Sequence, residues 1–188
     1  MSLRRFTPVA ILVALIGFAY PQAGWAQKAV PTQSIDPFGQ EVKLAPKPIV
    51  YVSGSGTWDK AYDILIDAFK KLDAYVGSAG LTAAGPAMTI YTSTDDSGFD
   101  FQAAIPLAET PKAPPGRNIG VGQSPDGKVL KFVHRGSYDD MNQTYEAITN
   151  YLDEKGLDAK DLLIEEYVTD LVKSPADMLV VNVFVPLK

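Results

Sequence analysis

The feature that most constrains the fold of this chain is a pattern that occurs twice. Residues 49–52 form a short apolar run, which is followed by serine and glycine and then by apolar residues at helical spacing over residues 58–76. Residues 129–133 begin a second pattern of the same kind, with helical spacing over residues 138–152. An internal repeat restricts the architecture more strongly than residue propensities do. The chain is therefore expected to fold as two copies of one unit.

The end of each predicted helix is marked by a Gly-Leu pair, at residues 80–81 and 156–157. Glycine suits the left-handed conformation that closes many helices. The first helix is expected to be about one turn longer than the second. After each helix come two apolar segments with turn residues between them, which predicts a β-hairpin. These segments are residues 88–92 and 101–107 in the first copy and residues 163–168 and 179–187 in the second.

Both copies are therefore predicted to be β-α-β-β modules, and the fold class is α+β. The first module covers residues 47–110, a linker covers residues 111–127, and the second module covers residues 128–188. Each small sheet keeps an edge or a face that needs a partner, so we expect the two modules to pair into one pseudo-two-fold domain. Because small-molecule sites tend to lie in clefts, we expect a central ligand cleft where the modules meet.

Residues 1–26 have the pattern of a signal peptide. A basic start and an apolar run over residues 9–20 are followed by small residues and a cleavage pattern before Gln27. The run is shorter than the roughly 20 residues that a membrane-spanning helix needs. We expect an exported protein, periplasmic or otherwise, with no membrane span after cleavage; the pattern leaves open retention of the segment as an anchor. Residues 27–46 are proline-containing and polar, which predicts an irregular lead-in.

The composition excludes several kinds of chemistry. The chain has 17 Lys and Arg against 22 Asp and Glu, a net charge of −5, which is the wrong sign for a nucleic-acid partner. It has no cysteine and one histidine, which excludes disulfides, thiolate nucleophiles and two-histidine metal sites. We therefore expect no metal and no cofactor, and chemistry that uses carboxylates, hydroxyls and aromatic rings. The sequence carries no signal for the oligomeric state.

Five short motifs follow one another along residues 47–188. Together they resemble the GyrI-like small-molecule-binding domain, the effector-binding half of many AraC-type and MerR-type bacterial regulators. The resemblance implies two fused β-α-β-β modules with an aromatic-lined, hydrophobic pocket between them, which often contains a glutamate that meets cationic, lipophilic ligands. The motifs are Gly85-Pro86 before a strand that ends at Tyr91, Asp100-Phe101 leading to Ile105-Pro106-Leu107, Val133-His134-Arg135-Gly136-Ser137-Tyr138, Glu165-Glu166-Tyr167 followed by Thr169-Asp170, and Val183-Phe184-Val185-Pro186-Leu187.

Two departures from the family pattern affect the expected function. The regulators carry a helix-turn-helix domain, and the signal segment and lead-in leave no room for one before residue 47, so we do not expect DNA regulation. Gln102 and Asn182 stand at two equivalent positions where the family's hairpin strands often carry an acid. Amides in place of carboxylates there weaken the comparison with the hydrolase members of the family.

Glu165 is the main candidate for the site. Strand alternation places Glu165 and Tyr167 on one face of the predicted strand and Glu166 on the other. The resemblance and the company of Tyr167 favour Glu165 as the inward residue. Its equivalent in the first module is Thr89, so the acid belongs to one module alone. A lone carboxylate in an apolar cleft has a raised pKa, which suits either a ligand cation or proton transfer.

Aromatic residues are the candidates for the pocket walls, since flat rings stack on ligands and attract cations. Tyr91 and Tyr167 carry most weight because they occupy matching strand positions in the two modules. His134, the single histidine, lies at a turn with no triad partner at a recognisable spacing, so we interpret it as structural. The full set of aromatic candidates is Trp58, Tyr91, Phe101, Tyr138, Tyr145 and Tyr167.

The sequence thus predicts an exported domain that holds a partly apolar small molecule between the two modules, with Glu165 as the charge partner of a cationic ligand. The alternative from another class is a hydrolase in which Glu165 is the general base and Tyr91 or Tyr167 donates a hydrogen bond to the developing anion. No other catalytic residue is assigned. A haem carrier is a third interpretation, which the single histidine disfavours.

Overall fold

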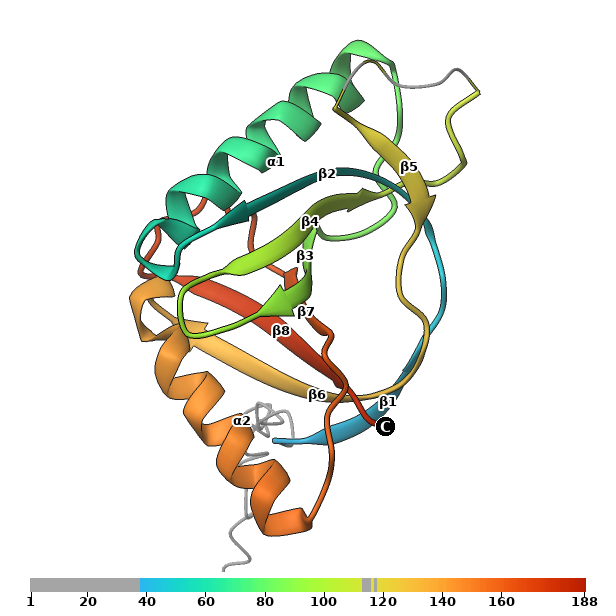
Figure 1. Ribbon diagram of the computed structural model, residues 1–188. Coiled ribbons are helices and arrows are strands. Elements are labelled where there is room, and N and C mark those ends of the chain that lie inside the picture. Colours follow the sequence, from blue (N-terminus) through green and yellow to red (C-terminus); the bar gives the residue numbers. More distant parts are fainter. Residues whose placement is uncertain (1–37, 113–115, 117) are drawn as a thin grey trace, which may run out of the picture. The chain divides into compact units, whose positions relative to one another are not determined.

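The computed structural model describes residues 38–112, 116 and 118–188, which form one antiparallel eight-stranded sheet and two α-helices (Figure 1). The α+β fold class is confirmed. The predicted signal peptide and residues 27–37 of the predicted lead-in lie outside the described residues. The elements are β1 Gln40–Leu44, β2 Pro48–Gly56, α1 Ala61–Ser78, β3 Met88–Thr94, β4 Phe99–Pro106, β5 Gly120–Gln123, β6 Gly127–Gly136, α2 Met141–Lys155, β7 Leu163–Tyr167 and β8 Leu179–Pro186, with short 3-10 turns at Trp58–Lys60 and Tyr138–Asp140.

The strand order confirms the duplication. From one edge of the sheet to the other it runs β1-β6-β8-β7-β3-β4-β2-β5. One module is β2-α1-β3-β4 and the other is β6-α2-β7-β8, and the two meet where β3 pairs with β7. That pairing places Thr89 opposite Glu165 and Met88 opposite Glu166. The centre of the sheet is therefore the seam between the modules.

The two edge strands are exchanged between the modules. β1 precedes the first module but pairs with β6, whereas β5 precedes the second module and pairs with β2. Our expectation of an irregular segment over residues 27–46 was wrong at Gln40–Leu44, and the expected linker over residues 111–127 contains β5. Both strands are short, and the hydrogen bonds that hold them come from the other module, so no local pattern marks them.

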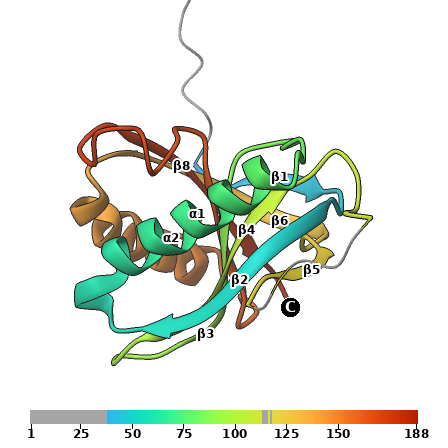
Figure 2. The ribbon, with the colours of Figure 1, turned by 90° about the horizontal axis from the view of Figure 1, so that it is seen from above.

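Both helices pack on one face of the sheet, which we call the helix face (Figures 1 and 2). α1 has 18 residues and α2 has 15, so the first helix is one turn longer, as predicted. Gly80 and Gly156 follow the helices with φ of 63° and 62°. The amides of Leu81 and Leu157 bond back to carbonyl oxygens five residues earlier, at 3.0 and 2.9 Å. The Gly-Leu pairs therefore close both helices as expected.

The sheet has an apolar core on each face. On the helix face, Leu65, Phe69 and Leu72 of α1 pack with buried residues of the strands. A second cluster on the opposite face includes Met88 and Ile164. The segments that lead from β1 to β2 and from β5 to β6 cross over this second face, so we call it the linker face (Figure 1).

Candidate functional site

Glu165 lies at the centre of the sheet, on β7, and its side chain is on the helix face. The residue is only 1% exposed, whereas Glu166 is half-buried on the linker face. The alternation of strand side chains separates these two neighbours. Thr89 lies directly across the seam on β3 and is also fully buried. Glu165 is therefore the inward glutamate, and it lies at the junction of the modules.

Three tyrosine hydroxyls surround the Glu165 carboxylate. Tyr145 of α2 donates to Oε1, while Tyr91 of β3 and Tyr167 of β7 donate to Oε2 at 3.0 and 2.6 Å. The hydroxyl of Thr89 lies 2.9 Å from that of Tyr167. Because Tyr167 uses its hydrogen on the carboxylate, Thr89 is the donor in that pair. We call Tyr91, Tyr145 and Tyr167 the tyrosine cage.

Burial dominates the electrostatics of this cluster. It raises the pKa of Glu165 above the usual 4.5, and the hydrogen bonds from the tyrosine cage, together with the proximity of His134, offset only part of the rise. Burial, followed by the Glu165 charge, also raises the pKa values of Tyr91, Tyr145 and Tyr167. The tyrosines therefore remain hydrogen-bond donors to Glu165.

The cage is asymmetric although the fold is duplicated. Tyr91 and Tyr167 lie at the same distance after Gly80 and Gly156, which is why both modules supply a strand tyrosine. At the helix position that corresponds to Tyr145, the first module has Phe69. The second module thus contributes both the carboxylate and an extra hydroxyl.

The other aromatic candidates lie around the cage rather than in it. Tyr138 is half-buried, and its ring lies 5.0 Å from that of Tyr62 of α1, so this pair joins the two modules. Burial and the charge of Glu165 raise the Tyr138 pKa. Trp58 is 42% exposed and lies 6.2 Å from the Tyr91 ring. Phe101 is buried in the core of the helix face.

Pockets lie on both sides of the cage. Tyr91 and Tyr145 help to line one of about 230 Å³, against Val185 of β8. Tyr167 and Phe69 help to line another of about 290 Å³. The expected central cleft is therefore not open over Glu165 in this structure: the tyrosines cover the carboxylate and face the pockets themselves.

His134 has a structural role in this geometry. It is 3% exposed, with Nδ1 2.8 Å from the Thr144 hydroxyl and Nε2 2.9 Å from the Ser137 carbonyl oxygen. Because a carbonyl oxygen only accepts, Nε2 carries a hydrogen and donates to Ser137. Within the described residues there is no group of three or more His, Asp or Glu placed to hold a metal. Nor does that part of the chain contain a helix with the length and apolarity to cross a membrane.

The structure is a two-module domain with a buried carboxylate at the junction of the modules. The family model described as the GyrI-like small molecule binding domain matches residues 40–188, and the chain belongs to this family. The resemblance inferred from the five motifs is thereby confirmed. No curated protein matches the chain.

Solved structures with the same fold have low sequence identity to this chain. The EcmrR C-terminal domain matches with a TM-score of 0.66 and 14% identity, over 80% of this chain and 96% of that one. In a cryo-EM complex of EcmrR with DNA the TM-score is 0.68 and the identity 15%, over 80% of this chain, which spans 57% of that EcmrR chain. SAV2435 bound to tetraphenylphosphonium matches with a TM-score of 0.57 and 12% identity, over 80% and 93% of the two chains. A hydrolase from Listeria innocua matches at 0.56 and 11%, over 80% and 92%. Identities this low establish a shared fold.

Proposed function

We propose that this small-molecule-binding domain takes a partly apolar cation at the seam between the modules, with Glu165 as its charge partner. The observation that carries the proposal is the buried carboxylate without a counter-charge. Among the described residues Glu165 has no ion-pair partner, and its contacts are hydroxyl donors. A buried charge that lacks a partner is costly, and a bound cation would supply that partner.

The aromatic surroundings of Glu165 favour an organic cation over a metal ion. The faces of tyrosine rings attract cations, and their area provides apolar contact for the body of a ligand. A metal ion would call for several carboxylate or carbonyl oxygens, whereas this cluster has one carboxylate. The fold relative SAV2435, solved with tetraphenylphosphonium, supports the same class of ligand.

Access to Glu165 requires the tyrosine cage to open. Tyr91 and Tyr145 separate the carboxylate from the pocket of about 230 Å³. A change in the side-chain torsion of Tyr145 would join this pocket to Oε1, because Tyr145 both lines the pocket and donates to that oxygen. Binding would then exchange tyrosine hydrogen bonds for a charge pair.

Isothermal titration calorimetry with tetraphenylphosphonium tests the proposal. We expect Glu165→Gln to weaken binding by about tenfold or more, since the charge partner is lost while the side-chain size is kept. Glu166→Gln is the matched control, because it makes the same change at the next residue on the opposite face. We expect tetraphenylborate, with the same shape and the opposite charge, not to compete. Equal affinities in wild type and Glu165→Gln would contradict the proposal.

A hydrolase that uses the same cluster is the second candidate. The raised pKa of Glu165 suits a general base, and Tyr91 or Tyr167 could donate to a developing anion. A hydrolase among the fold relatives supports this alternative. Turnover of strained or ester-like compounds that is lost in Glu165→Gln would favour it, whereas binding without turnover favours the binding domain.

We also propose that the protein is exported, on the basis of the signal-peptide pattern in residues 1–26. The intact mass of the protein from the periplasmic fraction of a bacterial host tests this proposal. Loss of the first 26 residues is the expected result. A full-length protein that stays with the cytoplasm would contradict it.

A further inference from the structure

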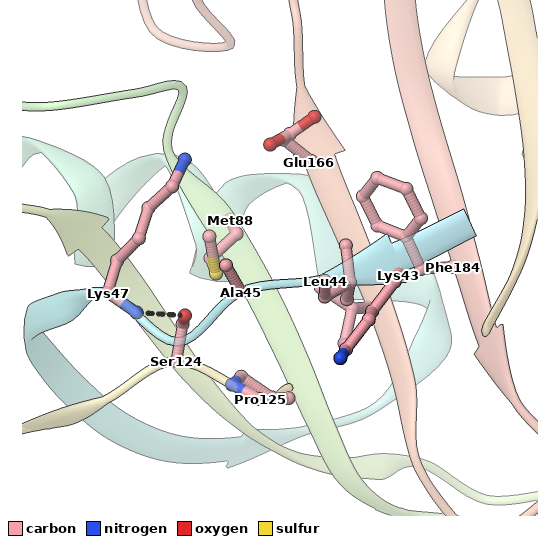
Figure 3. A pocket seen from close by; sticks show the side chains of 10 residues that line it. Lys43, Leu44, Ala45, Lys47, Met88, Ser124, Pro125, Glu166 and Phe184 are labelled. Carbon is pink, nitrogen blue, oxygen red and sulfur yellow. Dashed lines mark hydrogen bonds between the residues drawn. The ribbon is translucent and has the colours of Figure 1, made fainter. Parts of the chain in front are cut away.

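A cavity on the linker face has features of a binding site and is separate from the tyrosine cage. Its volume is about 230 Å³ (Figure 3). Met88, Ile164 and Phe184 form an apolar floor, and all three belong to the core of this face. Drug-sized pockets begin near roughly 300 Å³, so a ligand that fills this one is small.

The walls of the cavity are held in place by the crossing of two chain segments. The amide of Lys47, before β2, donates to the Ser124 hydroxyl at 3.0 Å, and the amide of Ser124, after β5, donates to the Lys47 carbonyl oxygen at 2.8 Å (Figure 3). Ser124 is buried. These reciprocal bonds fix both segments above the sheet, so the cavity is bounded by ordered backbone rather than by loose side chains.

Charged groups lie around the apolar floor. The ammonium groups of Lys43 and Lys47 end on different sides of the cavity, and Glu166 lies on the same side as Lys47 in the view (Figure 3). Glu166 accepts a hydrogen bond from the Asn182 amide at 2.8 Å. Within the described residues neither lysine forms an ion pair. The lining therefore has a net positive charge and two ammonium groups that are available to a ligand.

We propose that this cavity is a second small-molecule site, for a small amphipathic anion. A carboxylate on a short apolar chain matches it, because the chain would contact the floor and the carboxylate would bind the ammonium group of Lys43 or that of Lys47. The charge preference is opposite to that proposed at Glu165. The two sites lie on opposite faces of β3 and β7, so each can be tested without altering the other.

The methionine methyl groups provide a direct test with hexanoate as the probe. Met88 lies in the floor of the cavity, whereas Met141 is buried on the helix face and Met178 is exposed. In carbon-13 NMR spectra of the methionine methyl groups, assigned with Met88→Leu, we expect hexanoate to shift the Met88 signal saturably. We expect the Met141 signal to stay in place, and hexylammonium, the cationic analogue, to leave Met88 unchanged.

Charge variants test whether a lysine of the cavity binds the carboxylate of the probe. Removing both ammonium groups with Lys43→Ala and Lys47→Ala should weaken the hexanoate response about tenfold or more. The matched control removes Lys70 and Lys71, two exposed lysines of α1, and should bind as wild type does. A Met88 signal that does not move, that moves equally in both double variants, or that responds equally to hexylammonium would overturn the proposal. Retained hexanoate binding in Glu165→Gln would separate this result from the proposed function.

Discussion

At the scale of the residue, the Glu165 carboxylate loses hydration that three hydroxyl donors replace only in part. Its raised pKa means that, between the usual 4.5 and the folded-state value, the folded protein holds more of this proton than the unfolded chain does. The stability contributed by this group is therefore complete below pH 4.5 and is lost as pH rises through the folded-state pKa.

The first prediction follows from this sign. The free energy of unfolding of wild type, relative to that of Glu165→Gln, should fall as pH rises through this window and then level off, because the glutamine does not titrate. Urea unfolding at a series of pH values measures it. A relative stability that increases with pH would contradict the assigned direction of the pKa shift.

The second prediction concerns Tyr145, whose hydroxyl is the donor to Oε1. Tyr145→Phe gives the second module the same residue that the first module has at the equivalent position, Phe69. It should destabilise the protein by about 1–3 kcal/mol, because a buried carboxyl oxygen loses its donor. Tyr151→Phe, in the same helix but bonded at 3.4 Å to Gly39 instead, should cost clearly less. Equal losses in urea unfolding would show that the Tyr145 hydroxyl has no special role.

Part of this cluster is predictable from the sequence. Alternation along one strand selects Glu165 over Glu166, and the duplication pairs Tyr91 with Tyr167. The contact of the Tyr145 hydroxyl with Oε1 is not predictable in this way, because it depends on how α2 is rotated and placed on the sheet. The closure of the site over Glu165 depends on the same packing, and no spacing in the sequence encodes it.

At the scale of the element, glycine has opposite effects at two helix positions, which gives the third prediction. Gly156 has φ of 62° at the end of α2, so Gly156→Ala forces a left-handed conformation on alanine and should cost about 1–2 kcal/mol. Gly77 lies within α1, and an added methyl group there meets no atom within 4 Å. Gly77→Ala should therefore stabilise by about 0.5–1 kcal/mol. Thermal unfolding of the two variants should shift in opposite directions, and a shared direction would contradict the backbone argument.

Elements with their own periodicity and stop signals are predictable, and elements held by distant partners are not. Both helices and both hairpins follow from local patterns. β1 and β5 have 5 and 4 residues, and β5 has the sequence GVGQ with one branched apolar residue. Their positions depend on the free edges of β6 and β2, which exist only after the modules have formed.

At the scale of the whole molecule, neighbouring residues of the central strands serve different faces. Glu165 and Thr89 belong to the buried cluster around the tyrosine cage, while Glu166 and Met88 line the cavity on the linker face. A one-residue shift of β7 along β3 would exchange the faces of Glu165 and Glu166. The register of this single strand pair therefore determines the charge preference proposed for each face.

The exchange of edge strands predicts how the first half of the chain would associate as an isolated fragment. A fragment with residues 38–110 contains β1 without its partner β6, and β2 without its partner β5. Since β2 is the counterpart of β6, the β1 of one copy can pair with the β2 of another, and the reverse contact forms by symmetry. We expect such a fragment to be a homodimer in sedimentation analysis, and a folded monomer would contradict this. The intact protein is in this sense a dimer whose two subunits are joined in one chain.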